Sequence, residues 1–138
     1  MRILVDTNVI LDAILSRQPN AESAKNIITL FNNHKMKGYI TANSIADIFY
    51  LAQKVLDKVK AKEILRSLLR IFLIISVDSI DCHKALDLPL EDFEDALVLI
   101  CADKIKLDYV LTNDKGFLKI SNPLVPVISP EDLLVKFK

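Results

Sequence analysis

Short apolar runs alternate along the chain with longer segments in which apolar residues repeat at helical spacing. Runs rich in Ile, Val and Leu predict buried strands, which we expect at residues 2–5, 39–41, 72–77, 109–112 and 126–128. The longer segments carry the cap residues and apolar stripes of helices. We expect these at residues 9–15, 20–34, 43–56, 59–70, 78–87 and 92–106, with a last helix starting at residue 129.

The order of these elements indicates the fold class. Strands that are continuous apolar runs and alternate with helices are typical of a parallel sheet covered on both faces. The sequence therefore predicts an α/β three-layer sandwich with a central parallel sheet of four to five strands. The chain has 138 residues, two Gly and no low-complexity tract, so we expect residues 1–138 to form a single domain.

The composition limits the cellular compartments and the kinds of ligand that we expect for this protein. No apolar stretch approaches the ~18 residues of a membrane-spanning helix, and the two cysteines form no CxxC pair, so we expect a cytoplasmic protein with no membrane segment. A formal net charge of zero counts against a simple basic surface for nucleic acids. Basic residues nevertheless concentrate in residues 54–70 and acids in residues 78–95. Solvated helix faces, or a phosphate-facing region beside a cation-binding one, explain this pattern equally well.

Four aspartates stand beside apolar runs, where a carboxylate is rare unless it is paired or binds a metal. They are Asp6, Asp47, Asp95 and Asp114. Two follow predicted strands and two lie in the first turns of predicted helices, so all four are expected at the carboxyl edge of the sheet, where ligands bind. Oxygen ligands without His or Cys favour Mg²⁺ or Mn²⁺ over zinc. The pattern predicts a site for such a metal ion at this edge.

The segments around these aspartates resemble those of the PIN-domain nucleases. The similar segments are Asp6-Thr7-Asn8-Val9, Asp92-Phe93-Glu94-Asp95-Ala96 and Thr112-Asn113-Asp114-Lys115-Gly116-Phe117, together with residues 43–50 and 127–131. The similarity extends over nearly the whole chain and is closest to the small prokaryotic PIN proteins, many of which are VapC-like toxins of toxin–antitoxin pairs. A single DTN triplet would be a weak signal, whereas several segments in the right order are a strong one.

The resemblance implies a metal-dependent endoribonuclease that leaves a 5′-phosphate and a 3′-hydroxyl. It assigns catalytic roles to the four aspartates and metal binding to Asp6, Asp95 and Asp114, with Mg²⁺ or Mn²⁺ as the cofactor. Thr7, Asn8 and Thr112 match the polar positions beside the acids. The resemblance also implies an RNA substrate, a cognate antitoxin and a homodimer. This sequence departs from many relatives in having Asp47 where they carry Glu, and the acid at position 114 is the least constant one in the family.

Single residues also have simpler explanations. For the four aspartates these are a helix cap, a buried salt bridge, a turn residue or an acid on a helix surface. Asp12 and Asp103 also stand in apolar surroundings, and exposed helix positions explain them better than a site does. Asp92 and Glu94 flank Asp95, and capping is their simpler role, although one of them could be a secondary metal ligand.

Two other functions are compatible with parts of the sequence. One is a PIN-like fold that acts only as a protein-binding module. The other is an aspartyl phosphoacceptor domain, in which Asp6 would be the acceptor. Asn8 stands where one such class needs a second aspartate, and no lysine directly follows residue 128 where another needs it. The nuclease is therefore the function that we expect.

Overall fold

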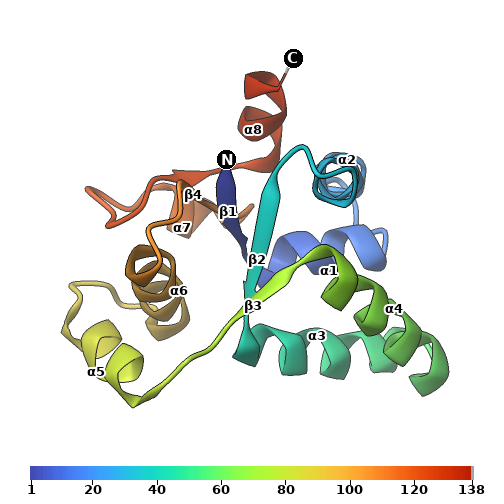
Figure 1. The fold of residues 1–138 in the computed structure, drawn as a ribbon, viewed down its shortest axis with the longest axis horizontal. Helices are drawn as coiled ribbons and strands as arrows, with labels where there is room; N and C mark the ends of the chain where they lie inside the picture. Colours follow the sequence, from blue (N-terminus) through green and yellow to red (C-terminus); the bar gives the residue numbers. More distant parts are fainter. Residues whose placement is uncertain (138) are drawn as a thin grey trace.

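The computed structural model describes residues 1–137 and has a five-stranded parallel sheet at its centre (Figure 1). The strands are β1 (Arg2–Val5), β2 (Lys37–Thr41), β3 (Leu73–Ile75), β4 (Tyr109–Leu111) and β5 (Val127–Ile128). They lie in the order β3-β2-β1-β4-β5, and every neighbouring pair is parallel. The predicted parallel sheet is confirmed, with five strands.

Seven of the helices correspond to those expected from the sequence. They are α1 (Thr7–Ile14), α2 (Ala21–Asn32), α3 (Ala42–Val55), α4 (Lys58–Ile71), α5 (Ser79–Asp87), α6 (Phe93–Lys104) and α8 (Pro130–Lys136). One short helix, α7 (Lys115–Leu118), was not predicted. None of the helices within residues 1–137 is long and apolar enough to cross a bilayer.

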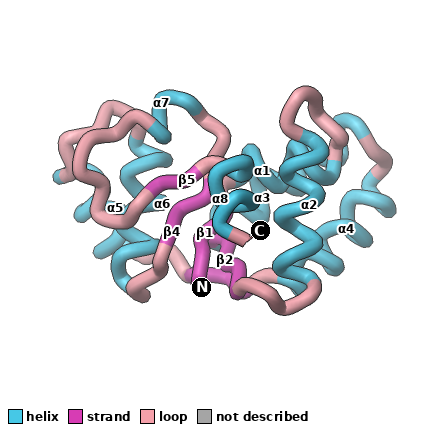
Figure 2. Tube along the Cα trace, turned by 90° about the horizontal axis from the view of Figure 1, so that it is seen from above, coloured by secondary structure: helices cyan, strands magenta, loops and turns pink. Residues whose placement is uncertain are grey.

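Side chains of each strand alternate between two apolar cores, one on each face of the sheet. In β1, Ile3 and Val5 join the core beneath α1, α2, α3, α4 and α8, whereas Leu4 joins the core beneath α5, α6 and α7. Figure 2 shows these two groups of helices on opposite sides of the strands. Helix α6 is buried along residues 96–102, which explains its nearly uncharged sequence. The predicted three-layer sandwich is confirmed.

The strand order determines where a ligand can bind. The chain moves outward from β1 to β2 and β3, then returns to the other side of β1 for β4 and β5. In such sheets, a crevice opens at the carboxyl ends of the two strands between which the direction changes. Here those strands are β1 and β4, and Val5 pairs with Leu111 at their carboxyl ends. The residues that follow, Asp6 and Thr112, therefore lie side by side.

Candidate active site

Asp6 is held firmly at the end of β1. Its backbone N–H donates to the Leu111 carbonyl at 2.9 Å, and its carboxylate caps helix α1 by accepting from the Thr7 N–H at 2.9 Å. The second carboxylate oxygen accepts from the Thr112 hydroxyl at 2.9 Å and from the Asn8 amide at 3.3 Å. Asp6 is therefore a helix cap, as the sequence allowed, and it lies at the carboxyl ends of β1 and β4.

The hydroxyl of Thr112 connects two of the aspartates. Thr112 is fully buried and donates to Asp6, while its own oxygen accepts from the Asp114 backbone N–H at 3.1 Å and from the Asn8 amide at 3.2 Å. Asp114 in turn caps α7, where its carboxylate accepts from the Gly116 N–H at 3.0 Å. The polar residues at positions 8 and 112 therefore fix the distance between β1 and the loop after β4.

Asp95 reaches the same place from the first turn of α6. Asp92 is the cap of this helix and accepts from the Asp95 N–H at 3.0 Å. Burial is the largest cause that raises the pKa of the Asp95 carboxyl, and together with the nearby charges of Asp92, Asp6, Asp114 and Glu94 it brings the pKa to about 7. Carboxylates from three distant segments thus repel one another at one point.

The pKa of Asp6 is raised as well, chiefly by burial. Hydrogen bonds from Thr112 and Thr7 oppose this shift, and the charges of Asp114 and Glu94 add to it. Asp6, Glu94, Asp95 and Asp114 therefore lie close enough to influence each other, and we call these four residues the acidic cluster. The ion pairs found within residues 1–137 use other acids, namely Asp12, Asp81 and Asp103.

Asp47 is exposed on α3. It lines a hollow of about 280 Å³ together with Thr7, Tyr50, Leu51 and Glu94. A second hollow of about 270 Å³ includes Asp92, Asp95 and Asp114 in its lining. Glu94 and Asp95, which are adjacent in sequence, therefore face the two hollows on either side of the cluster.

Glu94 belongs nearer to the centre of the site than the sequence suggested. Capping was its simpler role, but Asp92 is the residue whose side chain caps α6. Glu94 is exposed, lines the hollow with Asp47, and raises the pKa of both Asp6 and Asp95. The sequence indicated this position only through the place of Glu94 directly before Asp95, because both residues lie in the first turn of α6.

The prediction that Asp12 is exposed was wrong. Asp12 is 5% exposed because it lies on the side of α1 that faces the loop after β4. Its carboxylate accepts from Arg17 Nε at 2.8 Å and also from the side-chain amide of Asn113. Arg17 donates in addition to the Asn8 carbonyl at 3.2 Å. Asp12 thereby ties α1 to the segment that carries Thr112 and Asp114.

The donor set of the acidic cluster fits a hard divalent cation. Within residues 1–137, no three His, Cys, Asp or Glu side chains are grouped so that they could hold a metal ion. Mg²⁺ does not need such a group, since it is commonly bound by one or two carboxylates together with waters and phosphate oxygens. A cation would also relieve the repulsion that raises the pKa of Asp95. The oxygen donors of the cluster are therefore of the kind that Mg²⁺ and Mn²⁺ take.

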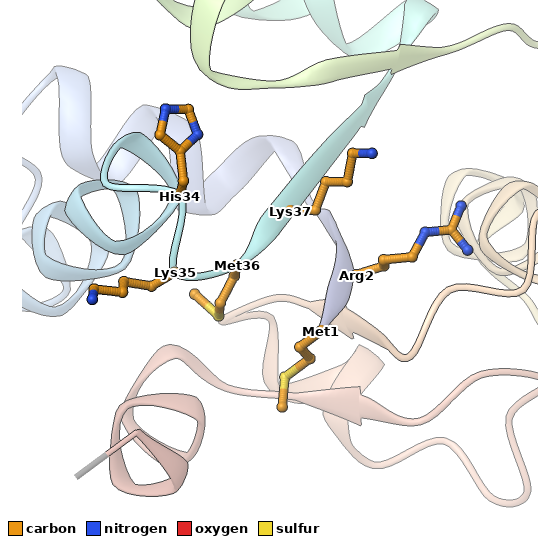
Figure 3. A pocket seen from close by; sticks show the side chains of 6 residues that line it. All are labelled: Met1, Arg2, His34, Lys35, Met36 and Lys37. Carbon is orange, nitrogen blue, oxygen red and sulfur yellow. The ribbon is translucent and has the colours of Figure 1, made fainter.

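A hollow at the other edge of the sheet does not share this chemistry. It measures about 400 Å³ and is lined by residues 1–2 and 34–37, at the amino ends of β1 and β2. Figure 3 shows His34 and Lys35 pointing away from Arg2 and Lys37. The Arg2 guanidinium is bound to the Tyr39 hydroxyl at 3.1 Å and the Ile105 carbonyl at 3.0 Å. This hollow is therefore lined by basic side chains and methionines rather than by carboxylates.

Comparison with known proteins identifies the family. The PIN-domain family matches residues 2–116, and the chain therefore belongs to the PIN-domain family. Over 136 residues it is 27% identical to Ribonuclease VapC1 of Aquifex aeolicus, covering 95% of this chain and 92% of that protein. The resemblance inferred from the sequence is thus confirmed.

Solved structures share the fold. VapBC2 of Rickettsia felis, bound to a DNA fragment from its promoter, aligns with a TM-score of 0.69 at 20% identity, over 94% of this chain and 98% of that one. VapC20 of Mycobacterium tuberculosis, a toxin that cleaves the sarcin–ricin loop, aligns with a TM-score of 0.65 at 14% identity, over 83% and 92%. At these identities the structures establish a common architecture.

Proposed function

We propose that this protein is a metal-dependent endoribonuclease and the toxin of a toxin–antitoxin pair. The observation that carries the proposal is the meeting of Asp6, Asp95 and Asp114 between β1 and β4, where burial and mutual repulsion raise the pKa of Asp95 to about 7. Carboxyl groups whose pKa values are strongly shifted and which lie in a crevice are concentrated at functional sites. The named relative, a ribonuclease, supports the choice of RNA as substrate.

Asp6, Asp95 and Asp114 are the residues that would hold the cation, Mg²⁺ or Mn²⁺. When bound, such an ion stabilises charge on a phosphate and lowers the pKa of a water molecule. The protein supplies the orientation. Thr112 and Asn8 fix the Asp6 carboxylate through hydrogen bonds of 2.9 and 3.3 Å. Thr112 also holds the backbone at residue 114 at 3.1 Å.

Acids on the α3 side of the crevice have a different role in this proposal. Asp47 and Glu94 line the hollow next to Thr7, within the same crevice but outside the hydrogen-bond network of Asp6. Their carboxylates would orient the attacking water and accept its proton, while Asp114 completes the other side. This assignment keeps Asp47 as a catalytic residue and removes the need for it to bind the metal directly.

Binding of RNA requires positive charge beside these acids. Lys115 and Lys119 are exposed at α7 next to Asp114, and Lys54 follows Asp47 by two turns on α3. These side chains would contact the phosphates that flank the scissile bond, and binding would weaken as the salt concentration rises. A solved structure of similar fold is a toxin–antitoxin complex from Klebsiella pneumoniae, which supports a cognate antitoxin for this chain. We also expect a cytoplasmic homodimer.

The experiment is cleavage of a fluorescently labelled RNA by the purified protein. Cutting should occur with Mg²⁺ or Mn²⁺ and stop when EDTA is added. Asp6→Asn and Asp95→Asn should reduce kcat by at least roughly a hundredfold with an unchanged circular dichroism spectrum, whereas Asp103→Asn, at an exposed ion pair, should cut normally. Variants that cut as fast as the parent protein would remove the assigned roles. Binding of RNA without cleavage by the parent protein would favour the non-catalytic module.

A further inference from the structure

One face of α3 leads from the crevice to the outside of the molecule. Asp47, Tyr50, Leu51 and Lys54 are spaced at i, i+3, i+4 and i+7 along this helix, which places them on one stripe. All four are exposed, whereas Ser44, Ile48 and Ala52 on the adjoining face are buried. We call the four exposed residues the α3 stripe. Its first residue faces Glu94 and Thr7 across the hollow beside the acidic cluster.

Tyr50 is the unusual member of the α3 stripe. Its side chain lines the same hollow as Thr7, Asp47 and Glu94, and the residue is nevertheless 55% exposed. Lys54 extends back over it, with Nζ 4.2 Å from the centroid of the ring. A large aromatic residue that lies beside a reaction centre and remains half-exposed has no role in the core. The structural position instead suits a planar ligand that would cover the ring.

We propose that Tyr50 stacks on an unpaired base of the RNA, next to the nucleotide that is cut, and that Lys54 contacts the adjoining phosphate. The proposal rests on the proposed nuclease function and names the substrate class as single-stranded or looped RNA. Recognition of unpaired RNA depends on aromatic side chains that receive splayed bases, and such stacking tolerates any base because each has a π-face.

The positive charge of Lys54 supports binding of RNA beside this hollow. The hollow contains the carboxylates of Asp47 and Glu94 and no basic residue in its lining, so a polyanion that reaches the acidic cluster needs a cation nearby. Lys54 supplies one at a distance of one helical turn from Tyr50. A base-paired RNA presents its bases to each other rather than to the protein, and it would leave the Tyr50 ring uncovered. The α3 stripe therefore favours unpaired over paired substrates.

A protein partner is the competing occupant of the α3 stripe. Val55 and Val59 are 68% and 67% exposed just beyond it, and an apolar segment of another chain could cover them. Tyr50 and Lys54 differ from these valines because they lie beside the reaction centre and join an aromatic ring to a cation. That combination matches a nucleotide, which has both a base and a phosphate. The experiments below distinguish the two occupants.

The first experiment measures stacking directly. The chain contains no tryptophan, so Tyr50→Trp introduces a single fluorescent reporter at the proposed site. In an Asp95→Asn background, which prevents cleavage, an unpaired ten-nucleotide RNA should quench this fluorescence, and the same RNA annealed to its complement should quench it much less. Val135→Trp is the matched control, because Val135 is 66% exposed on α8 at the opposite end of the molecule from α3 (Figure 1). Its fluorescence should not respond.

The second experiment uses the cleaving enzyme. Tyr50→Leu should raise KM for the unpaired RNA by roughly tenfold to a hundredfold with a small change in kcat, because stacking is lost equally from ground and transition states. Tyr50→Phe should restore most of the affinity, since it retains the ring. Lys54→Gln should raise KM and weaken its salt dependence.

The outcomes separate the two proposals. If the parent protein cuts RNA while Tyr50→Trp is not quenched and Tyr50→Leu retains its KM, the stacking site is wrong and the nuclease stands. If Tyr50→Leu instead loses only self-association or binding of an antitoxin, a protein covers the α3 stripe and the proposal is equally overturned. If the parent protein cuts no RNA, the nuclease fails, and quenching by unpaired RNA then reports stacking alone.

Discussion

Asp95 shows how an environment changes the chemistry of one side chain. Its helix position is ordinary, and Asp92 caps the helix before it. Burial and four neighbouring carboxyl groups raise its pKa from 3.8 to about 7. In the unfolded chain the same carboxyl ionises near its ordinary value, so the folded protein binds more protons than the unfolded chain between these two pH values. The cation-free protein therefore loses stability as the pH rises from about 4 to about 7.

This linkage predicts that Asp95→Asn stabilises the cation-free protein. The gain in the free energy of unfolding should be absent near pH 4 and reach about 1–2 kcal/mol above pH 7, which is less than the full pKa shift because solvent screens a partly exposed group. Urea unfolding in EDTA at pH 4 and pH 7.5 measures it, with Asp103→Asn as the control. Added Mg²⁺ should stabilise the parent protein more than the variant. A variant that is less stable than its parent at pH 7.5 would contradict the raised pKa of the Asp95 carboxyl.

The local sequence indicated the place of those acids that follow a strand or open an apolar helix. Asp6, Asp95 and Asp114 were predicted to meet, and in the structure they influence one another. Asp47 was expected at the same point, and in the structure it lines a hollow together with Glu94, which directly precedes Asp95. The positions of Asp47 and Glu94 depend on which side of each helix faces which strand, and the sequence alone does not give the strand order.

At the scale of elements, the decisive contact joins α1 to the loop after β4. Asp12 on α1 accepts from Arg17 and Asn113, and Asn113 stands between Thr112 and Asp114. From the sequence, Asp12 and Asp103 were both predicted to be exposed, because each interrupts an apolar helix. The structure buries the first and leaves the side chain of the second 41% exposed, 3.8 Å from Lys106. Their different surroundings give a direct comparison.

Asp12→Ala should lower the free energy of unfolding by about 2–3 kcal/mol, since it leaves a buried amide and an arginine without their acceptor. It should also reduce kcat for RNA cleavage, because the segment carrying Asp114 loses its attachment to α1. Asp103→Ala removes an exposed ion pair and should change stability by at most about 0.5 kcal/mol. Urea unfolding and cleavage rates of both variants test this difference. Equal effects of the two substitutions would show that the Asp12 network does not hold the site.

The short helix α7 also shows that neighbouring residues alone do not determine every element. The strands and seven of the helices were predicted because their apolar periodicity is strong, whereas α7 was missed. Its four residues, Lys115–Leu118, contain a glycine and directly follow the turn-like pair Asn113-Asp114. What makes them helical is the cap provided by Asp114 and the complete burial of Phe117 against the sheet. The second of these forces comes from residues distant in sequence.

At the scale of the whole molecule, the sequence predicted layers but not the order of strands. Parallel strands followed from their continuous apolar runs. The order β3-β2-β1-β4-β5 did not, because several orders bury the same strands. This order creates the crevice between β1 and β4, and it turns scattered carboxylates into one site. The edge strand β3 also leaves Leu73 and Ile74 46% and 40% exposed, and an exposed apolar edge is costly unless something covers it.

The proposed toxin makes a prediction for the living cell. A cytoplasmic endoribonuclease without its inhibitor would deplete essential RNA, so induced expression of the parent chain should arrest bacterial growth within a few doublings. Asp95→Asn, which retains the fold and the apolar surface, should express to the same level without arrest. Coexpression of the small reading frame adjacent to this gene should restore growth to cells that make the parent protein. Arrest by both proteins would point to aggregation through exposed apolar residues instead of cleavage, and normal growth with a demonstrably active enzyme would leave a nuclease that is not a toxin.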